Sequence, residues 1–158
     1  MNLQNKSIVL NVVLAIAVVV LGVRLVSGAE DAGESQTQEQ AVLDSLAGAN
    51  PYAKMLLKAP LAVVVCGDMD KVIEGGGRDF WIQDASAATE NLLLAAHAMG
   101  LGAVWTGAYP SEERSKAISA TLSLPDNLVP LNMIVIGYPA EHPQPKDKFK
   151  EENITFKR

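Results

Sequence analysis

The stretch 80–107 constrains the fold most, because it joins a long apolar helix to glycines that end it and to a strand that follows. Apolar residues recur at three- and four-residue steps within Trp81–Met99, and further leucines and alanines widen that stripe most of the way round the helix. The many alanines leave little side-chain bulk, so another backbone can approach closely. We therefore expect a buried helix, at the centre of a domain or across a subunit interface. After Gly100 and Gly102, residues 103–105 are expected to form a short buried strand.

The rest of the chain after residue 50 alternates between short helices and apolar strands. Leu61–Cys66 and Val129–Ile136 are continuous apolar runs of the length of buried strands. Residues 51–58 are expected to form a short helix, and 110–122 a longer one. Ser111 is placed to cap the longer helix, with two glutamates in its first turn. The pattern predicts an α/β fold with a sheet flanked by helices.

The N-terminal segment has the layout of an export signal. Ile8–Val23 is an apolar run broken only by Asn11, preceded by Lys6 and followed by small residues up to Ala29. Residues 1–29 are therefore predicted to be either a signal peptide cleaved after Ala29 or an uncleaved membrane anchor. This predicts an exported protein, periplasmic or membrane-anchored in a bacterium.

The next segment is polar. Residues 30–40 carry acidic and amide side chains with no large apolar residue, so 30–44 is predicted to be a solvated tether and the start of a first helix. Residues 45–158 form the predicted globular domain. The formal net charge of -5 and the lack of a basic stripe argue against a nucleic-acid partner.

Three features that could suggest chemistry are better explained structurally. The single cysteine, Cys66, ends an apolar strand and is expected to be a small buried hydrophobe. Gly75–Gly77 lacks the ending of a phosphate loop and is expected to be a connector. His97 has no second histidine nearby and is expected to be a hydrogen-bonded core residue. The sequence shows no nucleophilic triad, metal cluster or pair of carboxylates, so we predict no catalytic side chain and no metal.

Several motifs together resemble the C-terminal part of the nitroreductase family. They are FWIQD-SAAT-N-LLAAHA-GLGAVW-G-YP from Phe80, SLP, VPL..IVIGYPAE.P.PKDKF from Val129, and NITF near the end, and they cover about residues 50–156. The family consists of flavin-dependent homodimeric oxidoreductases. The resemblance implies a nitroreductase-like sheet with flanking helices. It also implies transfer of hydride from NAD(P)H through FMN to nitroaromatic or quinone-like acceptors.

The resemblance also assigns a cofactor site. Trp105, Thr106 and Gly107 correspond to the loop whose backbone faces the flavin ring, and Lys146 and Lys148 correspond to the basic pair that meets the FMN phosphate. No protein nucleophile is needed, because the isoalloxazine carries the hydride. The family's dimer implies self-association through the Trp81–Met99 helix, with the C-terminal tail crossing onto the partner.

The chain also departs from the family pattern. An Arg-x-Ser-x-Arg motif, a Pro-Ser-x-x-Asn-x-Gln-Pro-Trp motif and the strand after them are missing, which suggests an internal deletion between Asp44 and Ser45. The missing strand is expected to leave one sheet edge open. Two alternatives stay open: an impaired remnant that dimerises or interacts but does not hold flavin, and a membrane-tethered interaction module.

Overall fold

The computed structural model describes residues 16–22 and 32–157. Its centre is an antiparallel sheet in the order β1-β2-β4-β3, in which β2 and β4 pair at the middle. The strands are β1 (Ile16–Gly22), β2 (Leu61–Asp68), β3 (Gly102–Gly107) and β4 (Leu128–Gly137).

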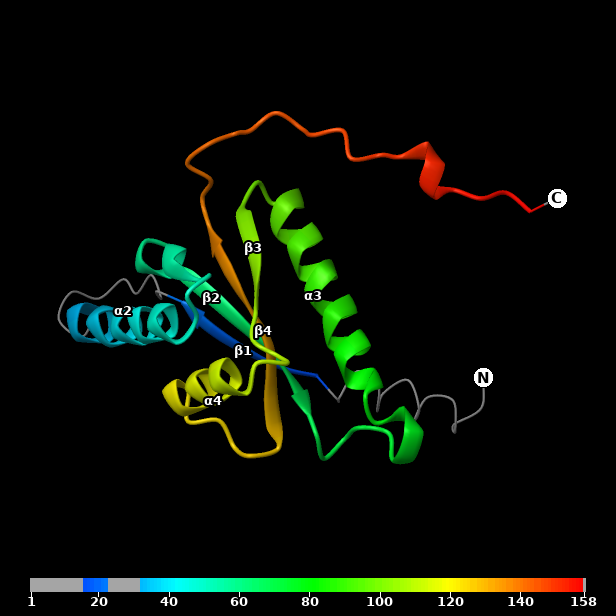
Figure 1. Cartoon of the computed structure of the whole chain (residues 1–158). Helices are drawn as coiled ribbons and strands as arrows, with labels where there is room; N and C mark the ends of the chain where they lie inside the picture. Colours follow the sequence, from blue (N-terminus) through cyan, green and yellow to red (C-terminus); the bar gives the residue numbers. More distant parts are fainter. Residues whose placement is uncertain (1–15, 23–31, 158) are drawn as a thin grey trace, which may run out of the picture.

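Helices cover both faces of the sheet (Figure 1). One face is covered by α2 and α4 and the other by α3. The helices are α2 (Ala32–Ala49), α3 (Phe80–Ala98) and α4 (Glu112–Thr121), and short 3-10 turns lie at η1 (Lys54–Leu57), η2 (Gly75–Gly77) and η3 (Glu151–Asn153).

The alternation of side chains along β2 divides the core into two clusters. Val64 and Cys66 pack with Leu43 and Leu46 of α2 and with Ile118 of α4. The intervening residues of β2 pack on the opposite face against α3. Because successive strand side chains point to opposite faces, a strand covered by helices on both sides must be apolar throughout. This explains the valine-rich sequence of β2.

The main elements predicted after residue 50 are confirmed, with shifts of a few residues at their ends. The strands at 61–66 and 129–136 extend to β2 and β4. The strand at 103–105 is the centre of β3, but its predicted burial is wrong, because Val104 is 40% exposed and its two neighbours are partly exposed. The helix predicted at 110–122 is α4, and Ser111 caps it, accepting a hydrogen bond from the backbone N–H of Arg114 at 3.4 Å.

The predicted export signal is wrong for the part of the apolar run that the structure describes. Residues 16–22 form β1, which pairs with β2 from Ile16↔Gly67 to Gly22↔Leu61. No helix in the described part of the chain is both long and apolar enough to cross a membrane. A short apolar run suits a signal and a buried strand equally, so periodicity could not separate them. The first half of the run, residues 8–15, lies outside the described residues.

β1 also corrects the expected open edge, since it covers the side of β2 that faces away from β4. The segment 32–40, expected to be a tether, belongs to α2, which continues without interruption through Asp44 and Ser45 to Ala49. The proposed deletion point thus falls inside a continuous helix. Leu43, Leu46 and Ala47 anchor the second half of α2 in the core.

Within one chain the helix α3 is buried on one face only, so the expectation that it lies at the centre of the domain is wrong, while burial across a subunit interface stays a prediction. Trp81, Ala85, Thr89 and Ala96 face the sheet and are buried. The outward face is exposed, with Leu94 at 58% of its full accessible surface, and Met99, which follows the last residue of α3, is exposed at 74%. His97 is also exposed, so the expectation of a core histidine is wrong.

Candidate functional site

The three residues predicted to face a flavin ring end the edge strand β3 rather than forming a loop. Trp105 packs at the margin of the cluster beneath α3. Thr106 is buried, and its hydroxyl donates a hydrogen bond to the carbonyl oxygen of Met133 at 2.9 Å. Gly107 pairs with Asn132 of β4. Among the described residues β3 pairs on one side, with β4, so part of its backbone hydrogen-bonding capacity faces outward.

The chain just after β3 is held from two sides. Asn50, which is fully buried, donates from Nδ2 to the carbonyl oxygen of Gly107 at 3.1 Å. On the other side the backbone N–H groups of Ala108 and Tyr109 both donate to the carbonyl oxygen of Leu131, each at 3.0 Å. Leu131 lies at a bulge in β4, and bulges are common beside functional sites. Sequence reasoning missed Asn50 because its partner is 57 positions away.

The space beside Gly107 is open. A Cβ atom built on this glycine would have no neighbour within 4 Å, and its backbone conformation does not require glycine. A flat group could therefore approach this peptide closely. The held backbone and the open space fit the part of a flavin site that faces the ring.

The two predicted phosphate-binding lysines do not lie with Gly107 in this chain. Lys146 and Lys148 are exposed on the extended segment that follows β4. Gly137, where that segment begins, pairs with Gly102 at the opposite end of β3 from Gly107. In Figure 1 the segment runs clear of the body of the domain. One copy of the chain thus separates the ring-facing and phosphate-facing parts of the predicted site.

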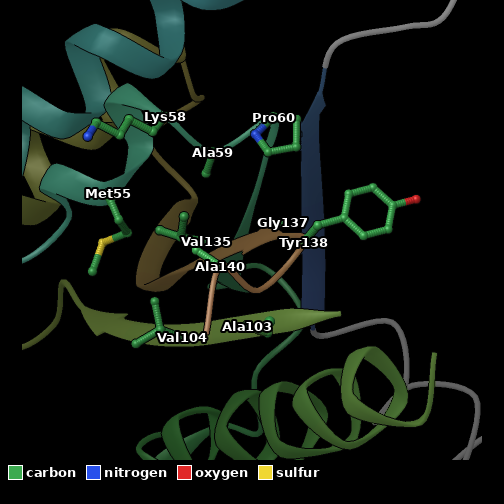
Figure 2. Close-up of a pocket in the computed structure, with 11 residues that line it drawn as sticks. Met55, Lys58, Ala59, Pro60, Ala103, Val104, Val135, Gly137, Tyr138 and Ala140 are labelled. Atoms are coloured by element: carbon green, nitrogen blue, oxygen red, sulfur yellow. The ribbon is translucent and has the colours of Figure 1, made fainter. Parts of the chain in front are cut away.

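A cavity of about 780 Å³ lies at that opposite end of β3, between η1, the start of β2 and the end of β4 (Figure 2). In Figure 2, Met55 points toward Val104, and the ring of Tyr138 points away from both. The lining is mostly apolar: Met55, Lys58, Ala59, Pro60, Gly102, Ala103, Val104, Val135, Gly137, Tyr138 and Ala140. It includes none of the five predicted cofactor contacts, so this cavity does not correspond to the predicted flavin site.

The ionisable groups near the sheet have structural roles. Burial raises the pKa of the Cys66 thiol to about 12, so the thiol stays protonated and packs as a hydrophobe, as the sequence predicted. The pKa of Asp68 is lowered, first by its hydrogen bond with Lys71; burial acts in the opposite direction as the second-largest effect, and a hydrogen bond from Asn127 lowers the pKa further. Asp68 thereby joins the end of β2 to the start of β4. In the described part of the chain no group of three or more potential ligands is arranged for a metal ion.

Two aromatic rings pack against each other close to the end of β3 at Gly107. The rings of Trp81 and Tyr109 meet edge to face with centroids 5.1 Å apart. On the other face of the sheet the guanidinium of Arg114 lies over the ring of Tyr52, 5.1 Å from its centroid. Neither pair was predicted from the sequence, since each joins segments distant along the chain.

Comparison with known proteins identifies the family. The sequence model of the nitroreductase family matches residues 19–138. A relative from Methanothermobacter thermautotrophicus, named "Putative NADH dehydrogenase/NAD(P)H nitroreductase", is 42% identical over 118 residues, which are 74% of this chain and 60% of that protein. The aligned part thus spans less than two thirds of that relative's length.

Solved structures of similar proteins agree with this family match. A crystal structure of a protein of the same name from Bacteroides thetaiotaomicron has a TM-score of 0.72 and 38% identity, covering 99% of this chain and 86% of that one. A protein from Desulfovibrio desulfuricans, solved in complex with FMN, has a TM-score of 0.63 at 23% identity, covering 100% and 86% of the two chains, which shows a shared fold.

The family match begins inside the N-terminal apolar run, at residue 19, in the middle of β1. This agrees with the place of that strand in the sheet and again contradicts the predicted exported or membrane-anchored location. With most of its length matched by the family model, and with a solved relative of the same fold above 30% identity, the chain belongs to the nitroreductase family.

Proposed function

We propose that this protein is an FMN-dependent oxidoreductase that takes hydride from NAD(P)H and passes it to nitroaromatic or quinone-like acceptors. The observation that carries the proposal is the backbone at Gly107, which is held by Asn50 and Leu131 and faces open space, in a chain of the nitroreductase family. FMN, when bound, supplies the hydride chemistry, so the protein needs only to bind and orient.

Each part of the chain has a separate task in this proposal. Trp105, Thr106 and Gly107 present backbone to the ring, and the buried side chain of Thr106 fixes β3 on β4. Lys146 and Lys148 contact the phosphate as point charges. Because the chain separates these two groups, we propose that two copies complete the site, the tail of one reaching the other.

The outward face of α3 supports such a homodimer. Leu94 is exposed there together with the small residues Ala87 and Ala98, which lets a second helix approach closely. Light scattering at micromolar concentration should show a dimer. Leu94→Glu should convert it to a monomer, whereas Leu57→Glu, at a residue exposed at 56% in η1, on the face of the sheet opposite α3, should not. A wild-type monomer would contradict the proposal.

The affinity for FMN should be low. The family's Arg-x-Ser-x-Arg and Gln-Pro-Trp segments are absent from the sequence. Each lost charge-assisted contact typically costs ~1.5 to 3 kcal/mol. Losing several therefore weakens binding by about three or more powers of ten. We expect a dissociation constant in the micromolar range or above, and slow turnover.

Quenching of flavin fluorescence during titration tests this directly. The double variant Lys146→Ala, Lys148→Ala should weaken binding about tenfold or more, since it removes both remaining charged contacts. The double variant Lys54→Ala, Lys116→Ala removes the same charge from η1 and α4 and should leave binding unchanged. Oxidation of NAD(P)H with a quinone acceptor measures turnover.

Two results would change the conclusion. Submicromolar FMN binding by the wild-type chain would show that the missing arginines are not needed. A stable dimer that binds no FMN would instead support the alternative, an impaired remnant of the fold that associates without a cofactor.

A further inference from the structure

Asn50 occupies a junction between three segments of the chain. Its side chain is fully buried where α2 ends, and both ends of its amide are used. Nδ2 donates to the carbonyl oxygen of Gly107 at 3.1 Å, and Oδ1 accepts the backbone N–H of Tyr52 at 3.1 Å. A buried amide with both donor and acceptor satisfied fixes the groups that it joins.

The segment that presents Asn50 is itself tied to the rest of the domain. The backbone carbonyl of Asn50 accepts from the N–H of Ala53 at 2.9 Å. The guanidinium of Arg114 in α4 lies over the ring of Tyr52. The backbone that carries Asn50 is therefore fixed by its own contacts. A side chain on a fixed backbone positions its hydrogen-bond partner more precisely than a side chain on a mobile loop does.

On the far side of the same peptide, Leu131 accepts from Ala108 and Tyr109. The peptide that joins Gly107 to Ala108 thus has its carbonyl oxygen directed by Asn50 and its N–H directed by the bulge in β4. Removing either contact would let this peptide rotate, because Gly107 has no side chain and meets no neighbour on its open side.

We propose that Asn50 is a positioning residue that sets the orientation of the Gly107–Ala108 peptide toward the bound ring. The inference deepens the proposed function and rests on it for the identity of the ligand. The positioning of the backbone itself can be tested without any ligand.

The decisive variant is Asn50→Asp. The ionised carboxylate still accepts from the N–H of Tyr52 but cannot donate to Gly107, and it places negative charge against that carbonyl. When protonated, the same side chain regains an O–H donor of nearly the same shape. Acidification should therefore reverse the defect. The charged side chain that contacts this segment from α4 is Arg114, stacked on Tyr52. The parent protein is measured at each pH as the reference. Asn153→Asp, in the exposed η3, makes the same charge change elsewhere.

The first arm uses no flavin. In a Trp81→Phe background the emission of Trp105 reports on the end of β3. Asn50→Asp should shift that emission to longer wavelength at neutral pH and restore it on acidification. If the Trp81→Phe background does not fold, hydrogen exchange at Ala108 and Tyr109 in the wild-type background replaces it, with faster exchange expected at neutral pH. No change in the folded variant would overturn the proposal.

The second arm measures FMN affinity by fluorescence quenching. Asn50→Asp should bind about tenfold more weakly at neutral pH and recover on acidification. A change in the first arm with unchanged FMN affinity would overturn the role toward the ring. If the wild-type chain binds no FMN while the first arm responds as expected, the proposed function fails and the positioning of Gly107 stands.

Discussion

Gly67 lies in β2 directly beneath Trp81, and replacing it by alanine should destabilise the fold strongly. A Cβ atom there would lie 2.4 Å from Cε3 and 2.9 Å from Cδ2 of Trp81, and 2.6 Å from the terminal methyl of Met69. The methionine can move, but the indole is 6% exposed and is held by Tyr109 at its edge. Ordinary contact begins near 3.4 Å, so the ring or the strand must move by about 1 Å.

Overpacking of a well-packed core typically costs about 1 to 3 kcal/mol. We expect a value near the upper end, ~3 kcal/mol, because the obstacle is a rigid ring. For a domain of this size, such a loss lowers the melting temperature by roughly 6 to 12 °C. The urea midpoint should fall by about 1 M or more, given a slope of ~1 to 3 kcal/mol per molar for small proteins.

Urea unfolding followed by far-ultraviolet circular dichroism measures this loss. Gly48→Ala is the matched control, because a Cβ there meets nothing within 4 Å in the helix α2, where alanine is favoured over glycine by up to about 1 kcal/mol. The near-ultraviolet signal of the Trp81–Tyr109 pair should also change in Gly67→Ala only. A Gly67→Ala protein with the wild-type midpoint would refute the steric reasoning.

Three further outcomes are expected. Cys66, buried and with its pKa raised to about 12, should react with a thiol reagent at neutral pH only after the protein is unfolded, and fast labelling of the native protein would contradict its assignment to the core. The pKa of Asp68 is lower in the folded state, so its contribution to stability is present above its unfolded pKa and is lost as the pH falls through the folded pKa. Asp68→Asn should therefore be less stable than wild type at neutral pH, and a difference that does not shrink in urea titrations carried toward pH 3 would argue against this cause. Gly107→Ala should keep or slightly raise stability, because its Cβ meets open space, yet lower FMN affinity if the ring lies there, which parallel urea and fluorescence titrations would separate.

The sequence predicted the elements whose signal is local. The valines of β2 and the apolar run of β4 could belong only to covered strands once their length was considered. Ser111 with its two following glutamates marked the start of α4. These signals depend on neighbours within one turn of helix or one strand, so no tertiary information was needed.

The predictions failed where one sequence pattern is compatible with two different structures and only tertiary packing decides between them. The apolar run before residue 23 suits a signal as well as a strand, and only its pairing with β2 separates the two. The polar start of α2 is helical although it offers few apolar residues of its own, because Leu43 and Leu46 dock the helix further along. Alanines on α3 gave no indication of which face meets the sheet. The contact of Asn50 with Gly107 had no local signal at all.

The strand order has a consequence for synthesis on the ribosome. β2 lies between β1, which precedes it, and β4, which begins 60 residues after β2 ends. While the chain emerges from the amino end, the valine-rich β2 can pair with β1 but has no second neighbour until residues 128–137 have been translated. During that interval one hydrogen-bonding side of β2 is available to other nascent chains. Folding yield in the cell should therefore depend on how quickly the part of the message for residues 69–137 is translated, and on whether a chaperone shields β2 until β4 has been made.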